Sequence, residues 1–180
     1  MAKAKKRAKK GAARRPKAKR AARRKVAPIP SGMHTVTPYL TVSDAAAAID
    51  FYKRAFGAKE RGRMAAPDGK VMHAAIQIGD SHVFLADEFP GSDTKSPAAL
   101  GSSSVTLHLY FRNADQAFAR ATAAGARSTM DPADMFWGDR FAKVVDPFGH
   151  CWSLAHHKED VSPKEMAKRA AAAFPGPPPG

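Results

Sequence analysis

The chain has 180 residues, of which 44% are hydrophobic and 26% are charged, a composition typical of one globular domain. A single cysteine, Cys151, excludes an internal disulfide, and no hydrophobic run approaches the ~20 residues that a helix needs to cross a bilayer. We therefore expect a soluble, cytoplasmic protein with no membrane partner. The unusual property is a formal net charge of +14 at pH 7.

This positive charge is concentrated in residues 1–30, which contain 14 Lys and Arg and no acidic residue, whereas the rest has 16 basic and 16 acidic side chains. Because the segment has no apolar face to bury, we expect residues 1–33 to form a disordered tail. Its Lys/Ala/Pro composition resembles the tails of linker histones. A flexible polycation binds nucleic acid regardless of sequence, since each neutralised phosphate releases counterions; the alternative is a solubilising extension. The expected phosphate-binding residues are Lys5, Lys6, Arg7, Lys9, Lys10, Arg14, Arg15, Lys17, Lys19, Arg20, Arg23, Arg24 and Lys25.

Hydrophobic periodicity after the tail predicts a strand followed by a helix. Residues 36–42 alternate between apolar and polar positions, which is the period of a half-buried strand. Ser43 suits the N-cap of the helix and Gly57 its C-terminal end. The helix has one apolar stripe, formed by Ile49, Tyr52 and Phe56. A short strand directly after the helix and two more at 71–78 and 82–86 complete the segment.

The same order of elements returns after a linker at 91–103. Residues 105–111 alternate as a strand, and Asn113 and Gly125 suit the two ends of a helix. A short strand follows the helix, with further strands at 140–145 and 151–156. Ser162-Pro163-Lys164-Glu165 combines an N-cap, proline at N1 and glutamate at N3, so we predict a helix over 162–174. Residues 175–180 are prolines and glycines and form a loose tail.

A repeat of 69 positions relates the two halves. Residues 37–44 match residues 106–113, and Val83-Phe-Leu-Ala matches Trp152-Ser-Leu-Ala at the same offset. Two segments with one offset indicate an internal duplication. We therefore predict an α+β domain at 34–161, built from two tandem β-α-β-β-β modules at 34–90 and 104–157 that form a cupped mixed sheet.

These modules resemble the vicinal oxygen chelate superfamily, which includes glyoxalase I, extradiol dioxygenases, and bleomycin and fosfomycin resistance proteins. The phrase Val42-Ser43-Asp44 before a helix with Phe51-Tyr52 carries the resemblance, as does Asp146-Pro147-Phe148-Gly149-His150. The segments 134–140 (Asp-Met-Phe-Trp-Gly-Asp-Arg) and 157–163 (His-Lys-Glu-Asp-Val-Ser-Pro) are similar to its PhnB-like branch. The resemblance covers residues 34–173 and implies a homodimer, in which paired modules complete two cups.

The resemblance also implies a divalent metal, held in catalytic members by the first and last strands of each module, usually through His or Gln and Glu. The repeat places these four positions at Thr37, Phe84, Thr106 and Ser153. Hydroxyl groups without carboxylate or imidazole help bind such metals weakly, and phenylalanine cannot bind them. A shift of two residues would substitute Tyr39 and His108, which still supplies one imidazole. We predict no metal and no other cofactor, and no glyoxalase or dioxygenase chemistry.

The strand face opposite the helices should line the concave side of the sheet as an aromatic cup with a few hydroxyl groups. His108 is the acid/base candidate there, because imidazole titrates near neutral pH; the alternative is a structural histidine. Trp137 and Arg140 form a rim that binds an anionic group, or Asp139 and Arg140 order a turn and Trp137 packs. The expected ligand-binding residues are Tyr39, Thr41, Phe84, Thr106, Tyr110, Trp137, Arg140 and Ser153.

Three functions are consistent with these observations. The first is a metal-free protein of the glyoxalase/bleomycin resistance type, which binds a small molecule and is anchored to nucleic acid by its tail. The second is an enzyme, either a lyase or dioxygenase whose metal ligands lie elsewhere or a metal-free enzyme that uses His108. The third is a structural protein of the nucleoid, in which the domain dimerises two cationic tails.

Overall fold

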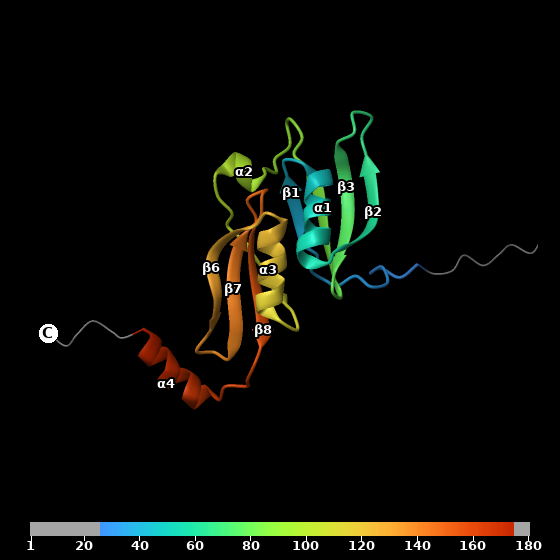
Figure 1. Cartoon of the computed structure of the whole chain (residues 1–180). Helices are drawn as coiled ribbons and strands as arrows, with labels where there is room; N and C mark the ends of the chain where they lie inside the picture. Colours follow the sequence, from blue (N-terminus) through green and yellow to red (C-terminus); the bar gives the residue numbers. More distant parts are fainter. Residues whose placement is uncertain (1–25, 175–180) are drawn as a thin grey trace, which may run out of the picture.

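The computed structural model describes residues 26–174 and contains two four-stranded mixed sheets (Figure 1). In each sheet the first strand pairs in parallel with the last, and the other neighbours are antiparallel. Sheet A has the order β1-β4-β3-β2, with β1 (Tyr39–Val42), β2 (Lys59–Ala65), β3 (Val71–Ile78) and β4 (Ser81–Asp87). Sheet B has the order β5-β8-β7-β6, with β5 (Thr106–Tyr110), β6 (Arg127–Asp134), β7 (Asp139–Val145) and β8 (Cys151–His157). The predicted α+β class with two β-α-β-β-β modules is confirmed.

The first residues of one helix and one strand differ from the sequence prediction. Helix α1 (Ala45–Phe56) is capped by Asp44, whose carboxylate accepts a hydrogen bond from the Ala47 N–H at 2.9 Å, one residue later than the predicted Ser43. Strand β1 begins at Tyr39 rather than at residue 36. The physical reason is Pro38, which has no N–H for a strand ladder; only its carbonyl takes part, accepting from Phe84 N–H at 2.9 Å.

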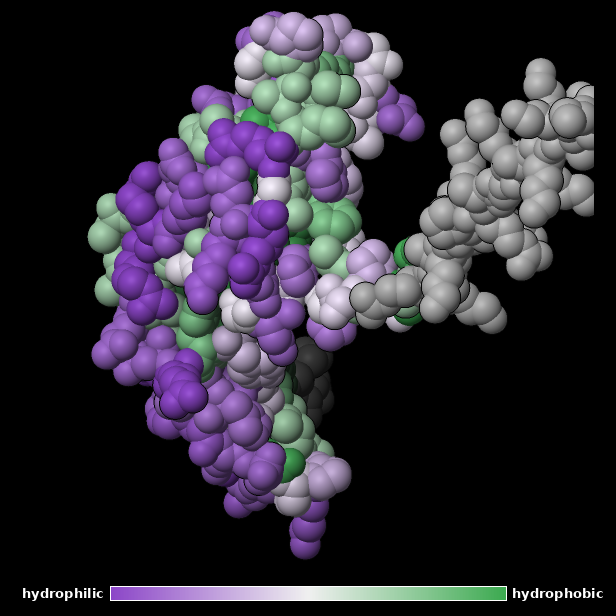
Figure 2. Space-filling view, turned by 90° about the vertical axis from the view of Figure 1, so that its right-hand side faces the viewer, coloured by the Kyte–Doolittle hydropathy of each residue, from purple (hydrophilic) through white to green (hydrophobic). Residues whose placement is uncertain are grey.

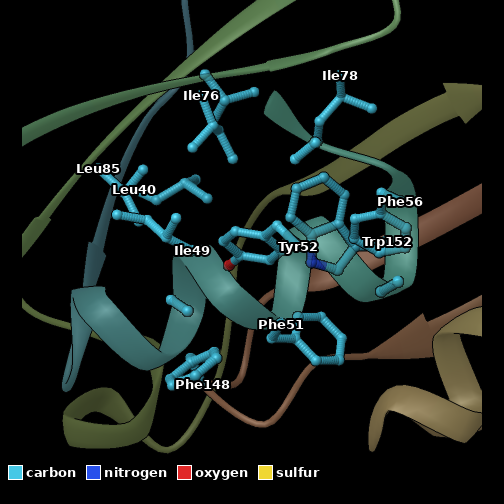
Figure 3. Packing of buried hydrophobic residues seen from close by; sticks show 14 of the residues in the cluster. Leu40, Ile49, Phe51, Tyr52, Phe56, Ile76, Ile78, Leu85, Phe148 and Trp152 are labelled. Atoms are coloured by element: carbon cyan, nitrogen blue, oxygen red, sulfur yellow. The ribbon is translucent and has the colours of Figure 1, made fainter. Parts of the chain in front are cut away.

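Helices α1 and α3 (Ala114–Ala124) lie side by side between the two sheets (Figure 1). Their packing joins both modules into one hydrophobic core. The Trp152 ring of β8 lies 5.3 Å from Tyr52 and 4.7 Å from Phe56, both on α1, as Figure 3 shows. Each of these large side chains is at least 97% buried, so this inter-module contact removes much apolar surface from water.

Asp146 explains the motif Asp146-Pro-Phe-Gly-His150 between β7 and β8. Its buried carboxylate accepts hydrogen bonds from the Phe148 and His150 backbone N–H groups, both at 2.9 Å, which fixes the turn. It also accepts from the Tyr52 hydroxyl and the Trp152 indole, both at 2.8 Å. Burial, and then Asp146, raise the pKa of Tyr52 well above its usual value. One carboxylate therefore links α1 of the first module to the second module.

Two short helices complete the described structure. Helix α2 (Pro97–Leu100), capped by the buried Ser96, lies in the segment expected to be a plain linker. Helix α4 (Pro163–Ala173) is capped by Ser162 and extends away from sheet B (Figure 1). No helix among residues 26–174 is long and apolar enough to span a membrane. Most of the predicted cationic tail, and the Pro/Gly tail, lie outside the described residues; residues 26–33 contain neither helix nor strand.

Each sheet places one face against the helices, and we call the opposite face its open face. The alternation of buried and exposed residues along β1, β3 and β4 follows this division. Figure 2 shows hydrophilic residues over most of one side of the molecule, with hydrophobic residues in smaller separate groups. Two large aromatic side chains remain exposed on the open faces: Tyr39 on sheet A at 53% and Tyr110 on sheet B at 63%.

Candidate ligand-binding site

The open face of sheet B carries an imidazole among aromatic rings. His108 lies opposite Ser153 on the neighbouring strand, and a 2.8 Å hydrogen bond joins its Nδ1 to the serine hydroxyl. The Tyr110 ring meets the His108 ring edge-on at 4.7 Å, and the Phe141 ring stacks on it at 6.0 Å. Trp137 contacts Phe141 edge-on at 5.5 Å. A hydrogen-bonding group held among three aromatic side chains is typical of small-molecule sites.

A buried carboxylate lies at one end of this face. Asp139, at the start of β7, accepts hydrogen bonds from the Tyr110 hydroxyl and the Trp137 indole, both at 3.2 Å. Its other oxygen accepts from His157 Nδ1 at 2.8 Å, and the remaining nitrogen of His157 donates to Asp160 at 3.0 Å. These hydrogen bonds, first to Asp139 and then to Asp160, raise the pKa of His157. The charged form of His157 is therefore favoured beside this carboxylate.

Asp139 also holds Tyr110 in place on the open face. Burial and the negative charge of Asp139 raise the pKa of Tyr110, so its hydroxyl stays protonated at neutral pH. Because that proton points to the carboxylate, the phenol oxygen is left as an acceptor toward a ligand.

The open face of sheet A has a similar arrangement. A 3.0 Å hydrogen bond joins the Tyr39 hydroxyl to His73 Nδ1, and the Phe84 ring contacts Tyr39 at 5.9 Å and His73 at 4.9 Å. The strand registers of the two faces correspond. Tyr39 lies opposite Phe84 in sheet A, and the residues 69 positions later, His108 and Ser153, lie opposite each other in sheet B. Each module therefore presents a histidine, a tyrosine and a phenylalanine.

The predicted cup residues fall on two different faces. Tyr39, Thr41 and Phe84 belong to sheet A, whereas Thr106, His108, Tyr110 and Ser153 belong to sheet B. Both sheets turn their helix faces toward the shared core, so the predicted cup residues of one chain lie on two separate open faces. Cys151 lies opposite Thr106 on sheet B, partly exposed.

Arg140 is not part of the open face, which corrects its predicted place in the cup. Its side chain pairs with Asp115 at the start of α3, at 2.7 Å, and with Asp134 at 3.4 Å. Neighbouring strand residues point to opposite faces, so Asp139 lies on the open face and the next residue, Arg140, points to the helix side. The Trp137 indole donates to Asp139 at 3.2 Å, and its ring packs edge-on against Phe141 at 5.5 Å.

The four positions implied for a metal do not form a suitable ligand set. Thr37 precedes β1, Phe84 has no donor atom, and the Ser153 hydroxyl already pairs with His108. In the part of the chain that the structure describes, no group of three or more His, Cys, Asp or Glu lies close enough to hold a metal ion. Neutral hydroxyl groups are poor ligands for the divalent metals of this type of site.

Sequence reasoning missed five residues of these faces. Alternate residues of a strand share a face, so the predicted strand 140–145 already placed Phe141 and Lys143 on the same face as Asp139. His73 gave no such signal, since its role depends on pairing with Tyr39. His157, at the end of β8, is hydrogen-bonded to the buried Asp139 through the pairing of β7 with β8. The missed set is His73, Asp139, Phe141, Lys143 and His157.

The two segments at 134–140 and 157–163 pack against each other. The Gly138 carbonyl accepts hydrogen bonds from the backbone N–H groups of Lys158 at 2.9 Å and Glu159 at 3.1 Å. Gly138 has a φ of +101°, and a Cβ there would lie 2.3 Å from the Glu159 carbonyl oxygen. Lys158 also pairs with Asp134 at 2.7 Å. These segments form one structural unit that supports the Asp139 cluster.

Comparisons with known proteins agree with this architecture. The family model of the Glyoxalase/Bleomycin resistance protein/Dioxygenase superfamily matches residues 32–154. An uncharacterized protein of Mycobacterium tuberculosis is 45% identical over 134 residues, which are 73% of this chain and 79% of that protein. A solved Arabidopsis thaliana structure is 31% identical, with a TM-score of 0.56, over 68% of this chain and 98% of that one. The PhnB protein of Bacillus cereus shares the fold at 14% identity and a TM-score of 0.55, over 68% and 99% of the two chains.

Proposed function

The chain belongs to the Glyoxalase/Bleomycin resistance protein/Dioxygenase superfamily, and on that premise we propose that it binds a small organic molecule without the superfamily's metal ion. One observation carries the proposal. Ser153 stands where catalytic members usually have a metal-binding Glu, and it is hydrogen-bonded to His108 among aromatic rings. Aromatic walls with a few fixed polar groups bind organic ligands by burial and orient them by hydrogen bonding.

A second copy of the chain completes the binding site in this proposal. The open faces of sheets A and B belong to different halves of one chain, and both leave a tyrosine more than half exposed. A homodimer that places sheet A of one copy against sheet B of the other would cover these rings and form two equivalent cups. Isologous dimers generate such paired sites by symmetry.

Native mass spectrometry of the protein purified without an affinity tag from its own source tests both parts. We expect a dimer with a retained organic molecule and less than stoichiometric metal. Stoichiometric Mn, Fe, Ni or Zn would contradict the metal-free function and favour a lyase or dioxygenase with other ligands. A monomer without a bound molecule at micromolar concentration would contradict the shared cup.

We propose nucleic-acid binding by the tail as a second function. Its support is the charge distribution, with 14 basic and no acidic residues in positions 1–30 and a neutral remainder. Polyelectrolyte binding gives an affinity that falls with salt, with a log–log slope of about −0.9 per neutralised phosphate of duplex DNA. Such binding would place the protein on the nucleoid.

Fluorescence anisotropy with a duplex of arbitrary sequence tests this second function. The chain truncated to residues 31–180 should lose measurable affinity and its salt dependence, whereas removal of residues 175–180 should change neither. The idea is wrong if residues 31–180 bind the duplex with the affinity and salt slope of the full chain.

A further inference from the structure

A row of three polar side chains crosses the middle of sheet B. Lys143 on β7 lies opposite Ser153 on β8, and Ser153 lies opposite His108 on β5. Neighbouring strands are about 4.8 Å apart, and residues in register share a face. An ammonium, a hydroxyl and an imidazole are therefore aligned side by side on the open face.

The charge of Lys143 has no acidic partner. Within residues 26–174 no carboxylate pairs with it, whereas Arg140 on the same strand and Lys158 after β8 are both paired. Lys143 lies partly buried on an interior strand of the sheet, where a charge loses part of its hydration. Such a position favours a counterion supplied by a ligand.

The neighbouring rows do not neutralise this charge. Asp139 is the acidic residue of β7 on this face, and its carboxylate already accepts hydrogen bonds from His157, Tyr110 and Trp137. On the other side of the row, Arg127 lies opposite Val145 and adds a second positive group. Asp131 on β6, beside the register partner of Lys143, accepts a hydrogen bond from Ser128 and makes no ion pair with Lys143.

The row also occupies the place at which the superfamily implies a metal. Ser153 stands at a ligand position that would hold a carboxylate, and the residue directly across from it is Lys143. A metal supplies fixed positive charge to ligand oxygens at such a site. Here an ammonium group can supply that charge, because it donates charge-assisted hydrogen bonds to a carboxylate.

The next row along the strands provides an apolar surface. Phe141 and Tyr110 lie on either side of the small residue Ala155, in register with it. The Phe141 ring is inclined by only 25° to the His108 ring, so flat surfaces lie beside the polar row. A planar ligand with an acidic group at one end matches this arrangement of rings and cation.

We propose that Lys143 and His108, with Ser153 orienting His108, bind the carboxylate of an aromatic organic acid, whose ring lies over Phe141 and Tyr110. This inference rests on the proposed function and names the ligand class of the same site. The carboxylate accepts hydrogen bonds from the Lys143 ammonium and from His108 Nε2–H, while the buried Ser153 donates its one proton to His108 Nδ1 and fixes that tautomer. No bond is made or broken in this step.

Titration of the full-length ¹⁵N-labelled protein with benzoate, and with uncharged benzamide of the same shape, tests the proposal. We expect benzoate to shift the amide signals of residues 108, 143 and 153 and to bind at least about tenfold more tightly than benzamide, because a charged hydrogen bond is replaced. Lys143→Gln should weaken benzoate binding about tenfold and abolish the preference for the acid. Lys143→Arg, which keeps the charge, should retain the preference.

Lys164→Gln is the matched control, because it removes one positive charge from α4, which extends away from sheet B (Figure 1), and should leave binding unchanged. Thermal unfolding shows whether each variant is folded. If Lys143→Gln does not fold, His108→Gln serves as a second variant of the same row. Equal binding of benzoate and benzamide, or wild-type affinity in folded Lys143→Gln, would overturn the anion-binding row while leaving the aromatic site. If neither compound binds, both this inference and the proposed aromatic site fail.

Discussion

Asp146 is a residue on which the joining of the two modules depends. It accepts hydrogen bonds from Tyr52 and Trp152, which come from different modules, in a buried position. A hydrogen bond to a charged group contributes about 1.5–3 kcal/mol, more than a neutral one. The Tyr52 hydroxyl should therefore contribute measurably to the free energy of unfolding.

We expect Tyr52→Phe to lower the free energy of unfolding by about 1–3 kcal/mol, since it removes one donor to Asp146 and keeps the buried ring. Urea denaturation at one protein concentration measures the change. Tyr39→Phe is the matched control: it removes the same hydroxyl from an exposed ring and should change stability by less than about 0.5 kcal/mol. Equal effects of both substitutions would show that the Asp146 link is not stabilising.

His157 should make stability depend on pH. Asp139 and Asp160 raise its pKa in the folded protein, whereas in the unfolded chain the pKa is about 6.5. A raised pKa means that the folded state holds the proton more tightly, so the stabilisation is complete below pH ~6.5 and is lost as the pH rises through the folded pKa. The facing groups are Asp139, Asp160 and the Tyr110 hydroxyl.

The difference in unfolding free energy between wild type and His157→Gln should therefore shrink as the pH rises above about 6.5. An NMR titration of the His157 ring should give a midpoint above that of unfolded histidine. A midpoint below it, or a difference that grows with pH, would show that the pair with Asp139 does not form. His34 carries no hydrogen bond to a carboxylate among the described residues, so His34→Gln is a suitable control.

At the scale of elements, the turn between β6 and β7 packs against residues 158–159, which directly follow β8. Gly138 is left-handed and touches the Glu159 carbonyl, so any Cβ there meets both backbone strain and a steric clash. Gly57, which ends α1, is also left-handed, with a φ of +68°, but a Cβ there meets nothing within 4 Å. These two glycines separate the cost of the conformation from the cost of the contact.

We expect Gly57→Ala to cost about 1 kcal/mol, which is the left-handed penalty alone. Gly138→Ala should cost at least about 2 kcal/mol more, because the backbone of Glu159 must move. Chemical denaturation measures both, and the amide signals of Asp139 and His157 should shift only in Gly138→Ala. Similar losses at both glycines would mean that the two segments are not packed together as described.

The elements of the fold could be predicted far better than the site. Alternation and caps located most strands and both long helices, since these signals are local in sequence. Helix α2 was missed because four residues are too few for a period, and β1 was extended because Pro38 fits an apolar alternation although it lacks a donor. The site depends on pairing across strands, which no local pattern carries: His157 meets Asp139 only through the β7–β8 register.

At the scale of the whole molecule, the single core determines where ligands can bind. Trp152 packs on α1, so the helix faces of both sheets are turned toward each other and are filled. The open faces of sheets A and B remain on the sides of the sheets away from this core. In the dimer that we propose, each cup combines sheet A of one copy with sheet B of the other.

Mixed dimers test this arrangement directly. Tyr39→Ala damages sheet A and Lys143→Gln damages sheet B, so a homodimer of either variant has two defective cups. After denaturation and refolding of an equimolar mixture, half of the dimers contain one chain of each kind. In a shared-cup dimer, such a hybrid has one cup with both defects and one cup with neither. Benzoate titration should then recover wild-type affinity at about one quarter of the sites. If each chain forms its own cup, or if binding needs only sheet B, mixing the two variants will recover no sites beyond the sum of the separate proteins.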